Sequence, residues 1–509
     1  MYARSHAVAV VGVRGRVVSV EAHVGRGLPA LHLTGLPGPA IQDARERVRP
    51  AVENSGLEWP LRRVTVNLSP ADVRKEGSGF DLPVAVAVLA ATGQIPAEPA
   101  ARYAVAGELS LRGGLVPTPG ILAVAAASAA RGFDGVIVPE ANAAEAALVD
   151  GIEVVPAPSL DRVVAFLRGT WRPVGGIPSA PPPVRGEADL SEVRGQYRAR
   201  RALEIAAAGG HNLLMVGPPG AGKTMLARRL PTILPSMTPA EALEATLLHS
   251  VAGLLRPGEG LLTERPFRAP HHSVSPAGLL GGGSGAVRPG EISLADHGVL
   301  FLDEVNEFRR DALEGLRQPL EDGRMVVVRS SGATEFPARF TLVAAANPCP
   351  CGFSEDPRRA CKCAPNRLLA YGQRLSGPLL DRIDLVLRIP RLSRAELMSS
   401  EAGEGSAAVR ARVEEARDRQ RRRLEGSSAT SNGETGGAQA RRLAGLTADA
   451  ERALGAAVER HGLTGRGFDR LLKVARTLAD LAGSERTRRD HVVEAVTFRS
   501  EPVGESVVA

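Results

Sequence analysis

Lysine is scarce in this sequence, cysteine is confined to one segment, and no long apolar run occurs. No run approaches the roughly 18 to 20 residues needed to span a bilayer as a helix, which argues against a membrane partner. The apolar stretch at residues 7–13 is followed by Arg14 and the run VVSVEAHV. This pattern predicts paired strands rather than a signal peptide, so we expect a cytoplasmic protein.

Arginine carries almost all of the positive charge. The formal net charge is +7, which permits a nucleic-acid partner through neutralisation of phosphates. Only four of the 63 basic residues are lysines, and the alternative is that so strong an arginine bias reflects genome composition. One of these four lysines, Lys223, falls where a phosphate-binding loop requires that residue type.

The segment GPPGAGKT fits the pattern G-x-x-x-x-G-K-[ST]. In this pattern glycines let backbone N–H groups close around phosphates, the lysine reaches the outer phosphates and the hydroxyl ligates Mg²⁺. A buried strand at residues 213–216 and a helix starting near Lys223 are expected on either side, as the motif requires. We predict that ATP and Mg²⁺ bind to the eight residues of this loop: Gly217, Pro218, Pro219, Gly220, Ala221, Gly222, Lys223 and Thr224.

Two further apolar strands are expected to end in polar residues. GVLFLDE ends in Asp303 and Glu304, and FTLVAAANP ends in Asn347. The carboxyl ends of parallel strands form the crevice in which open α/β sheets bind ligands. Asp303 is expected to complete the Mg²⁺ shell begun by Thr224, and Glu304 to orient or deprotonate the attacking water, with Asn347 as a second holder of that water. The alternative for Asp303 and Glu304 is a solvated strand end.

The pattern of elements divides the chain into several domains of an α/β multidomain protein. Residues 1–172 alternate Val-rich strands with Ala-rich helices, which predicts an α+β module. A proline-rich linker is expected at 173–190, an α/β ATPase core at 191–391 and a helical domain at 392–509. Within the last domain, residues 407–424 predict an exposed charged helix, solvated rather than bound to DNA.

Phosphoryl transfer also needs a positive charge to meet the developing negative charge, often an arginine supplied by a neighbouring subunit. The segment LSGPLLDRIDLVL offers Arg382, just before an apolar strand. If Arg382 reaches a neighbour's nucleotide, the enzyme works as a ring. The alternative is a surface ion pair.

These motifs resemble a known family. GPPGAGKT, VLFLDE, AAANPC and GPLLDRIDL, in this order and spacing, are similar to AAA+ ATPases of the magnesium-chelatase/MCM-like branch. TGRGFDRLLKVARTLADL resembles the lid helix of that branch, which makes Arg466 the candidate lid arginine and Arg470 the second choice. Nearly the whole chain is similar to the ComM/YifB family of magnesium-chelatase-like proteins.

The resemblance implies a homo-hexameric ATPase that moves on single-stranded or branched DNA and promotes branch migration during recombination, as in natural transformation. Recombination proteins would then be further partners. Two alternatives remain. One is a chelatase-type chaperone that remodels a partner during metal insertion, and the other is a nucleotide-gated scaffold that hydrolyses little ATP.

The amino-terminal module resembles Lon-type Ser-Lys proteases, a fold of the ribosomal S5 domain 2-like class. The resemblance rests on RKEGSGFDLPVAVAVLAA and GELSLRGGLVPTPGILAVAAAS. The position of the serine nucleophile is occupied by Gly79 and that of the lysine base by Leu122. A Lon-like module without peptidase activity is therefore expected, because both catalytic groups are missing.

Two insertions in the core suit a DNA motor. Residues 265–298 are rich in glycine and proline and match the helix 2 insertion of the branch. Residues 321–343 predict a β-hairpin around Ser330, Ser331 and Gly332, with Arg329 near the tip as a candidate phosphate contact. An ordinary surface hairpin is the alternative. Neither tip carries an aromatic residue for base stacking, and His271 and His272 are set aside as structural.

All four cysteines fall in PCPCGFSEDPRRACKCAP, directly after Asn347. Two pairs of thiols in a cytosolic protein favour ligation of a structural Zn²⁺ by Cys349, Cys351, Cys361 and Cys363. The C-x-C spacing departs from the commoner C-x-x-C. Reduced thiols in a loop and redox sensing are the alternatives.

Overall fold

The first sheet is built from the Val-rich segments near the amino terminus. In the computed structural model, which describes residues 1–72, 75–176, 188–283, 287–329, 332–354, 356, 359–393, 396 and 403–499, the first two strands form the expected antiparallel pair. β1 (Tyr2–Val11) and β2 (Arg14–Gly25) are joined by Gly12 and Val13. Gly12 has a φ of 62°, a left-handed conformation that glycine adopts without steric cost.

This sheet has seven strands in the order β3-β4-β2-β1-β5-β8-β9. Helix α3 (Asp81–Ala91) packs on one face, and all of its residues are buried, as its uniformly apolar sequence requires. Helix α5 (Ile121–Arg131) also packs against β1 and β2. The remaining elements of this part are β3 (Ala30–Thr34), α1 (Pro39–Gln42), α2 (Ala44–Asn54), β4 (Arg63–Ser69), α4 (Ala97–Arg102), β5 (Tyr103–Val105), β6 (Glu108–Leu109), β7 (Leu115–Val116), β8 (Gly135–Pro139), α6 (Ala143–Ala146), β9 (Glu153–Ala157) and α7 (Leu160–Leu167).

The second sheet has five parallel strands in the order β11-β12-β15-β10-β16. Its three central strands, β12 (Val299–Leu302), β15 (Thr341–Ala346) and β10 (Leu213–Val216), are buried at every residue, which explains their unbroken apolar runs. The other elements of this core are α8 (Tyr197–Gly209), α9 (Lys223–Ile233), α10 (Pro239–Ala252), β11 (Phe267–Arg268), α11 (Pro276–Leu280), α12 (Glu291–Leu294), α13 (Arg310–Gly315), α14 (Arg317–Asp322), α15 (Pro365–Gly372), α16 (Gly377–Leu380) and β16 (Leu385–Arg388).

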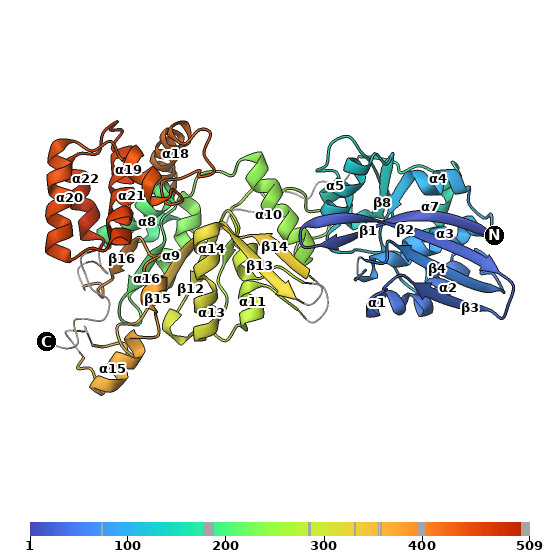
Figure 1. Cartoon of the computed structure of the whole chain (residues 1–509), viewed down its shortest axis with the longest axis horizontal. Helices are drawn as coiled ribbons and strands as arrows, with labels where there is room; N and C mark the ends of the chain where they lie inside the picture. Colours follow the sequence, from blue (N-terminus) through green and yellow to red (C-terminus); the bar gives the residue numbers. More distant parts are fainter. Residues whose placement is uncertain are drawn as a thin grey trace.

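A β-hairpin stands between β12 and β15 in the chain, as the sequence predicts. β13 (Arg324–Arg329) pairs antiparallel with β14 (Gly332–Pro337), and the register sets Arg329 opposite Gly332. Ser330 and Ser331 lie outside the described residues. Figure 1 shows this hairpin between the second sheet and the amino-terminal sheet.

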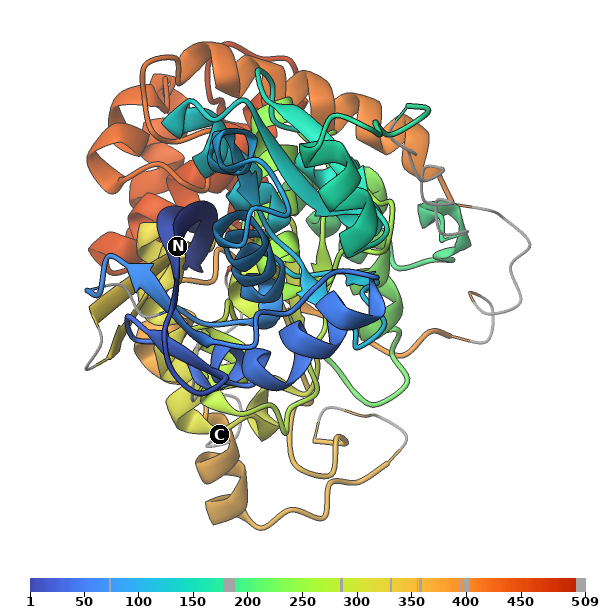
Figure 2. The same cartoon turned by 90° about the vertical axis from the view of Figure 1, so that its right-hand side faces the viewer.

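The C-terminal part is helical and shares a hydrophobic core with α8, α9 and β16. It consists of α18 (Ser406–Arg423), α19 (Gly437–Leu443), α20 (Ala448–His461), α21 (Gly465–Leu481) and α22 (Arg489–Thr497). Helix α18 keeps its charged residues at least partly exposed, as predicted, but Val409, Val413 and Ala416 form an apolar stripe that is buried against α8 and α9. In Figure 2 the amino-terminal part faces the viewer and these orange and red helices lie beyond it.

The predicted linker, residues 173–190, falls largely on residues 177–187, which lie outside the described part of the chain. Across the residues that the structure does describe, no helix combines the length and the apolar character needed to cross a membrane.

Candidate nucleotide-binding site

The phosphate loop connects β10 to α9 at the carboxyl edge of the second sheet. A side chain at Gly217 would place its Cβ 2.3 Å from the carbonyl oxygen of Ile389, so only glycine allows this approach to the chain after β16. Gly220 and Gly222 have φ values of 77° and 89°, which favour glycine. Helix α9 begins at Lys223 and directs its unpaired N–H groups and the positive end of its dipole at the loop.

Lys223 lies between the loop and the end of β15. Its Nζ donates hydrogen bonds to the carbonyl oxygens of Gly217 at 2.6 Å and Pro218 at 3.1 Å, and to Oδ1 of Asn347 at 3.0 Å. Burial lowers the pKa of Lys223, and the charges of Asp303 and Glu304 oppose that shift. The three hydrogen bonds use all three donors of the ammonium group.

Thr224 and Asp303 meet across the crevice. The Thr224 hydroxyl donates to Oδ2 of Asp303 at 2.7 Å. The two oxygen atoms are therefore close together, and Thr224 directly follows Lys223 in the loop. Glu304 follows with a φ of 50°, an uncommon left-handed conformation for a residue with a side chain. Its backbone N–H donates to Oδ1 of Asp303 at 3.0 Å, which helps to hold this geometry. Its side chain is 53% exposed.

His272 lies beside Glu304, a position that no sequence motif predicts. Its Nδ1 is 3.8 Å from Oε2 of Glu304, and its ring contacts Phe308 edge to face. His272 belongs to the 265–298 segment and itself lies more than 30 residues before Glu304. No short sequence pattern could therefore have predicted the contact between the two side chains. Only the folding of that segment over the end of β12 brings the imidazole to the carboxylate.

These residues fit a magnesium nucleotide. An alcohol and a carboxylate are hard oxygen ligands of the kind Mg²⁺ prefers, and the glycine loop, the start of α9 and the Lys223 ammonium are donors for phosphate oxygens. The residues placed together here are Lys223, Thr224, Asp303, Glu304 and Asn347.

Arg382 lies at the opposite, amino-terminal edge of the same sheet. The side-chain amide of Asn212, which precedes β10, donates to the Arg382 carbonyl oxygen at 2.9 Å. The guanidinium donates to the carbonyl oxygens of Arg317 at 3.0 Å and Pro378 at 2.5 Å, and it pairs with Glu321. The four residues of β10 alone span roughly 13 Å, so Arg382 does not reach the phosphate loop of its own chain.

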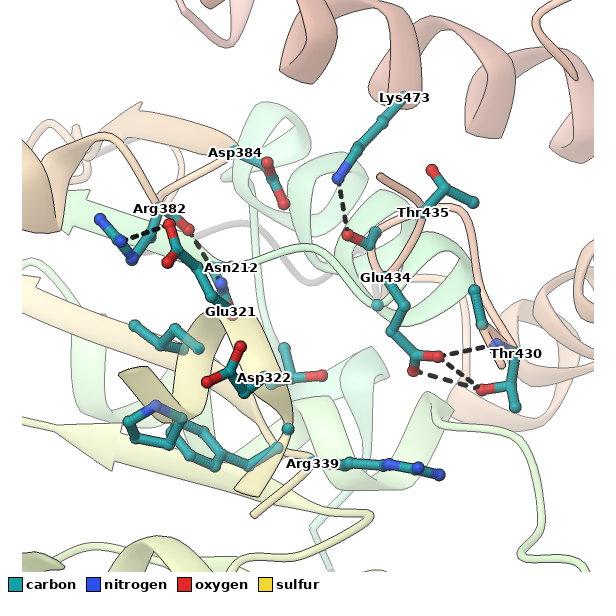
Figure 3. Close-up of a pocket in the computed structure, with 18 of the residues that line it drawn as sticks. Asn212, Glu321, Asp322, Arg339, Arg382, Asp384, Thr430, Glu434, Thr435 and Lys473 are labelled. Atoms are coloured by element: carbon teal, nitrogen blue, oxygen red, sulfur yellow. Dashed lines mark hydrogen bonds and ion pairs between the residues drawn. The ribbon is translucent and has the colours of Figure 1, made fainter. Parts of the chain in front are cut away.

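Arg466 and Arg470 of α21 lie near Arg382 rather than near the phosphate loop. Arg470 is buried and donates to Oδ1 of Asp381 at 2.9 Å, whereas Arg466 is 61% exposed and stands 3.9 Å from the same carboxylate. All three arginines line a cavity of about 540 Å³ between the sheet edge and the C-terminal helices. Figure 3 shows Arg382 and Glu321 on one side of this cavity and Lys473 and Glu434 on the other.

The four cysteine sulfur atoms converge in the segment after Asn347, where all lie within 4.8 Å of one another. The Sγ of Cys349 is 3.3 Å from that of Cys351 and 3.8 Å from that of Cys361, and Cys351 and Cys361 are 3.6 Å apart. A tetrahedral ZnS₄ centre with bonds of about 2.3 Å has sulfur atoms about 3.8 Å apart, so the set fits zinc. A Cβ on neighbouring Gly352 would lie 2.5 Å from Cδ of Pro219, so this segment rests on the phosphate loop.

Gly79 and Leu122, the two positions compared with the protease nucleophile and base, are half-buried and buried, respectively. Gly79 lies in a short 3₁₀ turn, and a Cβ there would contact Thr118. The N–H of Leu122 donates to Oε2 of Glu145 at 3.3 Å and to Oγ of Ser250, a residue of α10, at 3.4 Å. The nearby Lys75 is buried, with Nζ donating to the carbonyl oxygens of Gly35 at 2.9 Å and of Pro70.

A parallel sheet whose carboxyl edge carries a phosphate loop and an Asp-Glu pair defines a P-loop nucleotide-binding protein. Three family profiles match in succession: subunit ChlI of Mg-chelatase over residues 20–142, magnesium chelatase subunit ChlI over 189–397 and the subunit ChlI C-terminal region over 403–499. The chain belongs to the magnesium-chelatase-like family that includes YifB and ComM.

Similarity to individual relatives extends over nearly the whole chain. It is 47% identical over 496 residues to the uncharacterized protein Rv2897c of Mycobacterium tuberculosis, covering 97% of this chain and 98% of that protein. It is 43% identical over 500 residues to YifB of Salmonella typhimurium, covering 97% and 96%. It is 41% identical over 504 residues to the competence protein ComM of Haemophilus influenzae, again covering 97% and 96%.

Proposed function

We propose that this protein is an ATP-hydrolysing ring motor that acts on DNA, as a translocase or branch-migration helicase in homologous recombination or natural transformation. The observation that best supports a ring is the separation of Arg382 from the phosphate loop of its own chain. One edge of the sheet holds the groups that grip a triphosphate, and the other edge holds a guanidinium that such a site needs. A ring of subunits, with the hexamer as the expected form, joins the two edges between neighbours.

Bound ATP with Mg²⁺ would supply a γ-phosphoryl group whose transfer to water releases free energy. Lys223 would exchange its contacts with Gly217, Pro218 and Asn347 for phosphate oxygens. Thr224 and Asp303 would direct their oxygens at the cation.

Glu304 would accept a proton from the attacking water at its carboxylate, and His272 would help to orient that carboxylate. Asn347, released from Lys223, would hold the water.

Arg382 of the adjacent subunit would approach the outer phosphate once the ion pair between this arginine and Glu321 is broken. Arg466 is better suited than Arg470 to act beside it, because it is exposed while Arg470 is tied to Asp381 and to the Leu380 carbonyl oxygen. α21 with its neighbours would then serve as the lid of the ATPase core, with residues 191–391 as that core and 392–509 as the lid domain.

DNA is the proposed substrate because the near full-length similarity extends to a competence protein, and because the hairpin β13–β14 presents Arg329 beside its tip. The test measures ATP hydrolysis with and without forked DNA, together with movement of a joint molecule. Stimulation by DNA, lost with joint-molecule movement in Lys223→Ala and Glu304→Ala, is expected. A protein that hydrolyses ATP at the same rate with and without DNA and moves no junction would refute the proposal. Particles imaged with ATP and forked DNA test the ring directly.

A chelatase-type chaperone is the second candidate, because all three matching profiles are of magnesium chelatase subunit ChlI. It predicts stable capture of a metal-binding partner protein and no response to DNA. A pull-down with ATP present, paired with the DNA assay above, separates the two candidates.

Two structural roles complete the proposal. The four cysteines would hold Zn²⁺ as a clip that braces Asn347 and the phosphate loop, since Gly352 rests on Pro219. The module at 1–172 would be a Lon-like fold without peptidase activity, joined by the linker 173–190. ATP-dependent cleavage of unfolded casein by the purified protein would contradict the second assignment.

A further inference from the structure

The turn of the first hairpin touches the hairpin of the ATPase core. A Cβ built on Gly12 would lie 2.9 Å from Cγ2 of Thr334 and 3.4 Å from the carbonyl oxygen of Glu335. Gly12 belongs to the β1–β2 turn and Thr334 to β14, more than 300 residues later. Figure 1 shows β1 and β2 extending from the amino-terminal sheet toward β13 and β14.

The contact falls on the face of the core hairpin that carries Arg329. The register pairs Thr334 with Val327 and Gly332 with Arg329, and residues opposite one another in an antiparallel pair share a face. Along that face the next pair outward from Thr334 is therefore the one that holds Arg329. The β1–β2 turn lies one cross-strand pair from this arginine.

Two exposed arginines follow the turn. Arg14 and Arg16 continue the face of β2 that buries Val18 and Val20, but they stand beyond the end of the core and are exposed. Within the described residues neither makes an ion pair, and the nearby Glu335 pairs with Arg324. Two uncompensated guanidinium groups on one strand face are the kind of surface that binds phosphates.

The 265–298 segment adds to the same region. A Cβ on Gly282 would lie 3.5 Å from Nη2 of Arg329, so this part of the segment packs against the arginine. Gly282 and Arg288 exchange two backbone hydrogen bonds, of 3.0 Å and 2.9 Å, which places exposed Arg288 next to that contact. The segment, the core hairpin and the β1–β2 turn thus meet at one place.

A second contact fixes the amino-terminal module on the core. Ser250 of α10 accepts a hydrogen bond from the Gly120 N–H at 2.8 Å and donates its hydroxyl proton to Oε2 of Glu145 at 2.5 Å. Ser250 and Glu145 are both buried, so breaking the contact leaves unpaired polar groups. Two separated contacts, at α10 and at the β1–β2 turn, hold the arginines of the module in register with the core hairpin.

We propose that Arg14 and Arg16 of the amino-terminal module form one phosphate-binding rim with Arg329 and Arg288, and that this rim grips the sugar-phosphate backbone of DNA. The inference rests on the proposed function, which supplies DNA as the ligand. The rim offers guanidinium groups and no aromatic platform among its described residues, so binding is independent of sequence and strongly dependent on salt. The inactive protease-like module is then a DNA-holding element.

The test uses the full-length chain with ATPγS and a fluorescein-labelled forked DNA, with affinity measured by anisotropy across a salt series. The variant is Arg14→Ala with Arg16→Ala. The matched control is Arg26→Ala with Arg63→Ala, two exposed arginines at the other end of β2, where Arg26 follows that strand and Arg63 begins its neighbour β4, roughly 35 Å away along β2. Arg329→Ala reports on the core hairpin alone.

Each lost phosphate contact lowers the slope of log affinity against log salt by about 0.7 to 0.9. We expect the Arg14/Arg16 variant to lose about 1.5 from that slope, to bind roughly tenfold or more weakly at moderate salt, and to keep its ATPase rate without DNA. The control pair keeps the wild-type slope. If the slope of the Arg14/Arg16 variant is unchanged while Arg329→Ala weakens DNA binding, the proposed rim is refuted but the proposed motor function is not. An equal loss of slope in the control pair has the same meaning. A wild-type protein that binds no DNA overturns both.

Discussion

Mixing two inactive variants tests whether each active site is shared between subunits. Glu304→Gln removes the carboxylate after β12, and Arg382→Ala removes the guanidinium before β16, at opposite edges of one sheet. If Arg382 acts on a neighbour's nucleotide, a ring containing both variants has some sites with an intact Glu304 from one subunit and an intact Arg382 from the next. If Arg382 acts within its own chain, no subunit of the mixture is complete.

The expected magnitudes are large enough to decide. Loss of an arginine that meets the transferred phosphoryl group lowers kcat by about 10³ to 10⁵, and loss of the general base by about 10² to 10⁴. In randomly assembled rings from an equal mixture, about one site in four combines the two intact residues, so hydrolysis recovers to about a quarter of the wild-type rate. The assay is steady-state ATP hydrolysis after the variants are mixed as dissociated subunits and allowed to assemble.

A mixture that stays at the rate of the separate variants would refute a shared site, provided that both variants fold and assemble. That control matters for Arg382, because its side chain is only 9% exposed and satisfies the carbonyl oxygens of Arg317 and Pro378. Its removal leaves those acceptors unpaired, at about 1 to 3 kcal/mol each where water cannot replace it. Thermal unfolding and gel filtration of Arg382→Ala check this directly, and Arg382→Lys supplies a milder variant.

Three further predictions concern the loop, the cysteines and a buried carboxyl group. Gly217→Ala places a methyl group 2.3 Å from the Ile389 carbonyl oxygen, so we expect a loss of about 1 to 3 kcal/mol in unfolding free energy and weaker ATP binding, measured by denaturant unfolding and nucleotide titration. Gly455→Ala, at an exposed position of α20 where the added Cβ meets no atom, is the control, and equal stability of Gly217→Ala and wild type would contradict the clash. Metal analysis should find about one zinc per chain in the purified protein and about none in Cys361→Ser, and zinc-free wild type would overturn the assignment. Burial raises the pKa of Asp296 from 3.8 to about 7, so the folded protein keeps a proton that the unfolded chain loses, and unfolding free energy should fall by up to about 4 kcal/mol between about pH 4 and pH 7. Asp296→Asn should flatten that pH dependence, and an unchanged profile would exclude the carboxyl group as its source.

The clearest local motifs were readable because covalent neighbours carry them. The glycines and lysine of GPPGAGKT are consecutive, so the strand, loop and helix around them follow from their spacing. Continuous apolar runs in the sequence predict buried parallel strands. Because the carboxyl ends of such strands share one edge of the sheet, the sequence also predicted that Asp303, Glu304 and Asn347 lie close together. The β13–β14 hairpin followed from alternation on either side of a short turn.

Helix α18 was predicted only in part, because its many charged residues obscure a short apolar stripe. Its arginines and glutamates suggest a solvated helix, but Val409, Val413 and Ala416 recur at helical spacing and form a narrow stripe that packs on α8 and α9. Such a stripe becomes informative only when another element supplies an apolar surface for it. The periodicity of a sequence indicates which face of a helix can be buried, but it does not indicate which element packs against that face.

The sequence by itself determined the elements and the chemical groups at their ends, because both depend on residues a few positions apart. Tertiary structure alone decided which distant groups meet: His272 against Glu304, Gly352 against Pro219, and Gly12 against Thr334. It also placed Arg382 on the far edge of the sheet from the phosphate loop. Contacts of this kind depend on how whole elements pack, and packing is set by the combined burial of many side chains rather than by any local pattern.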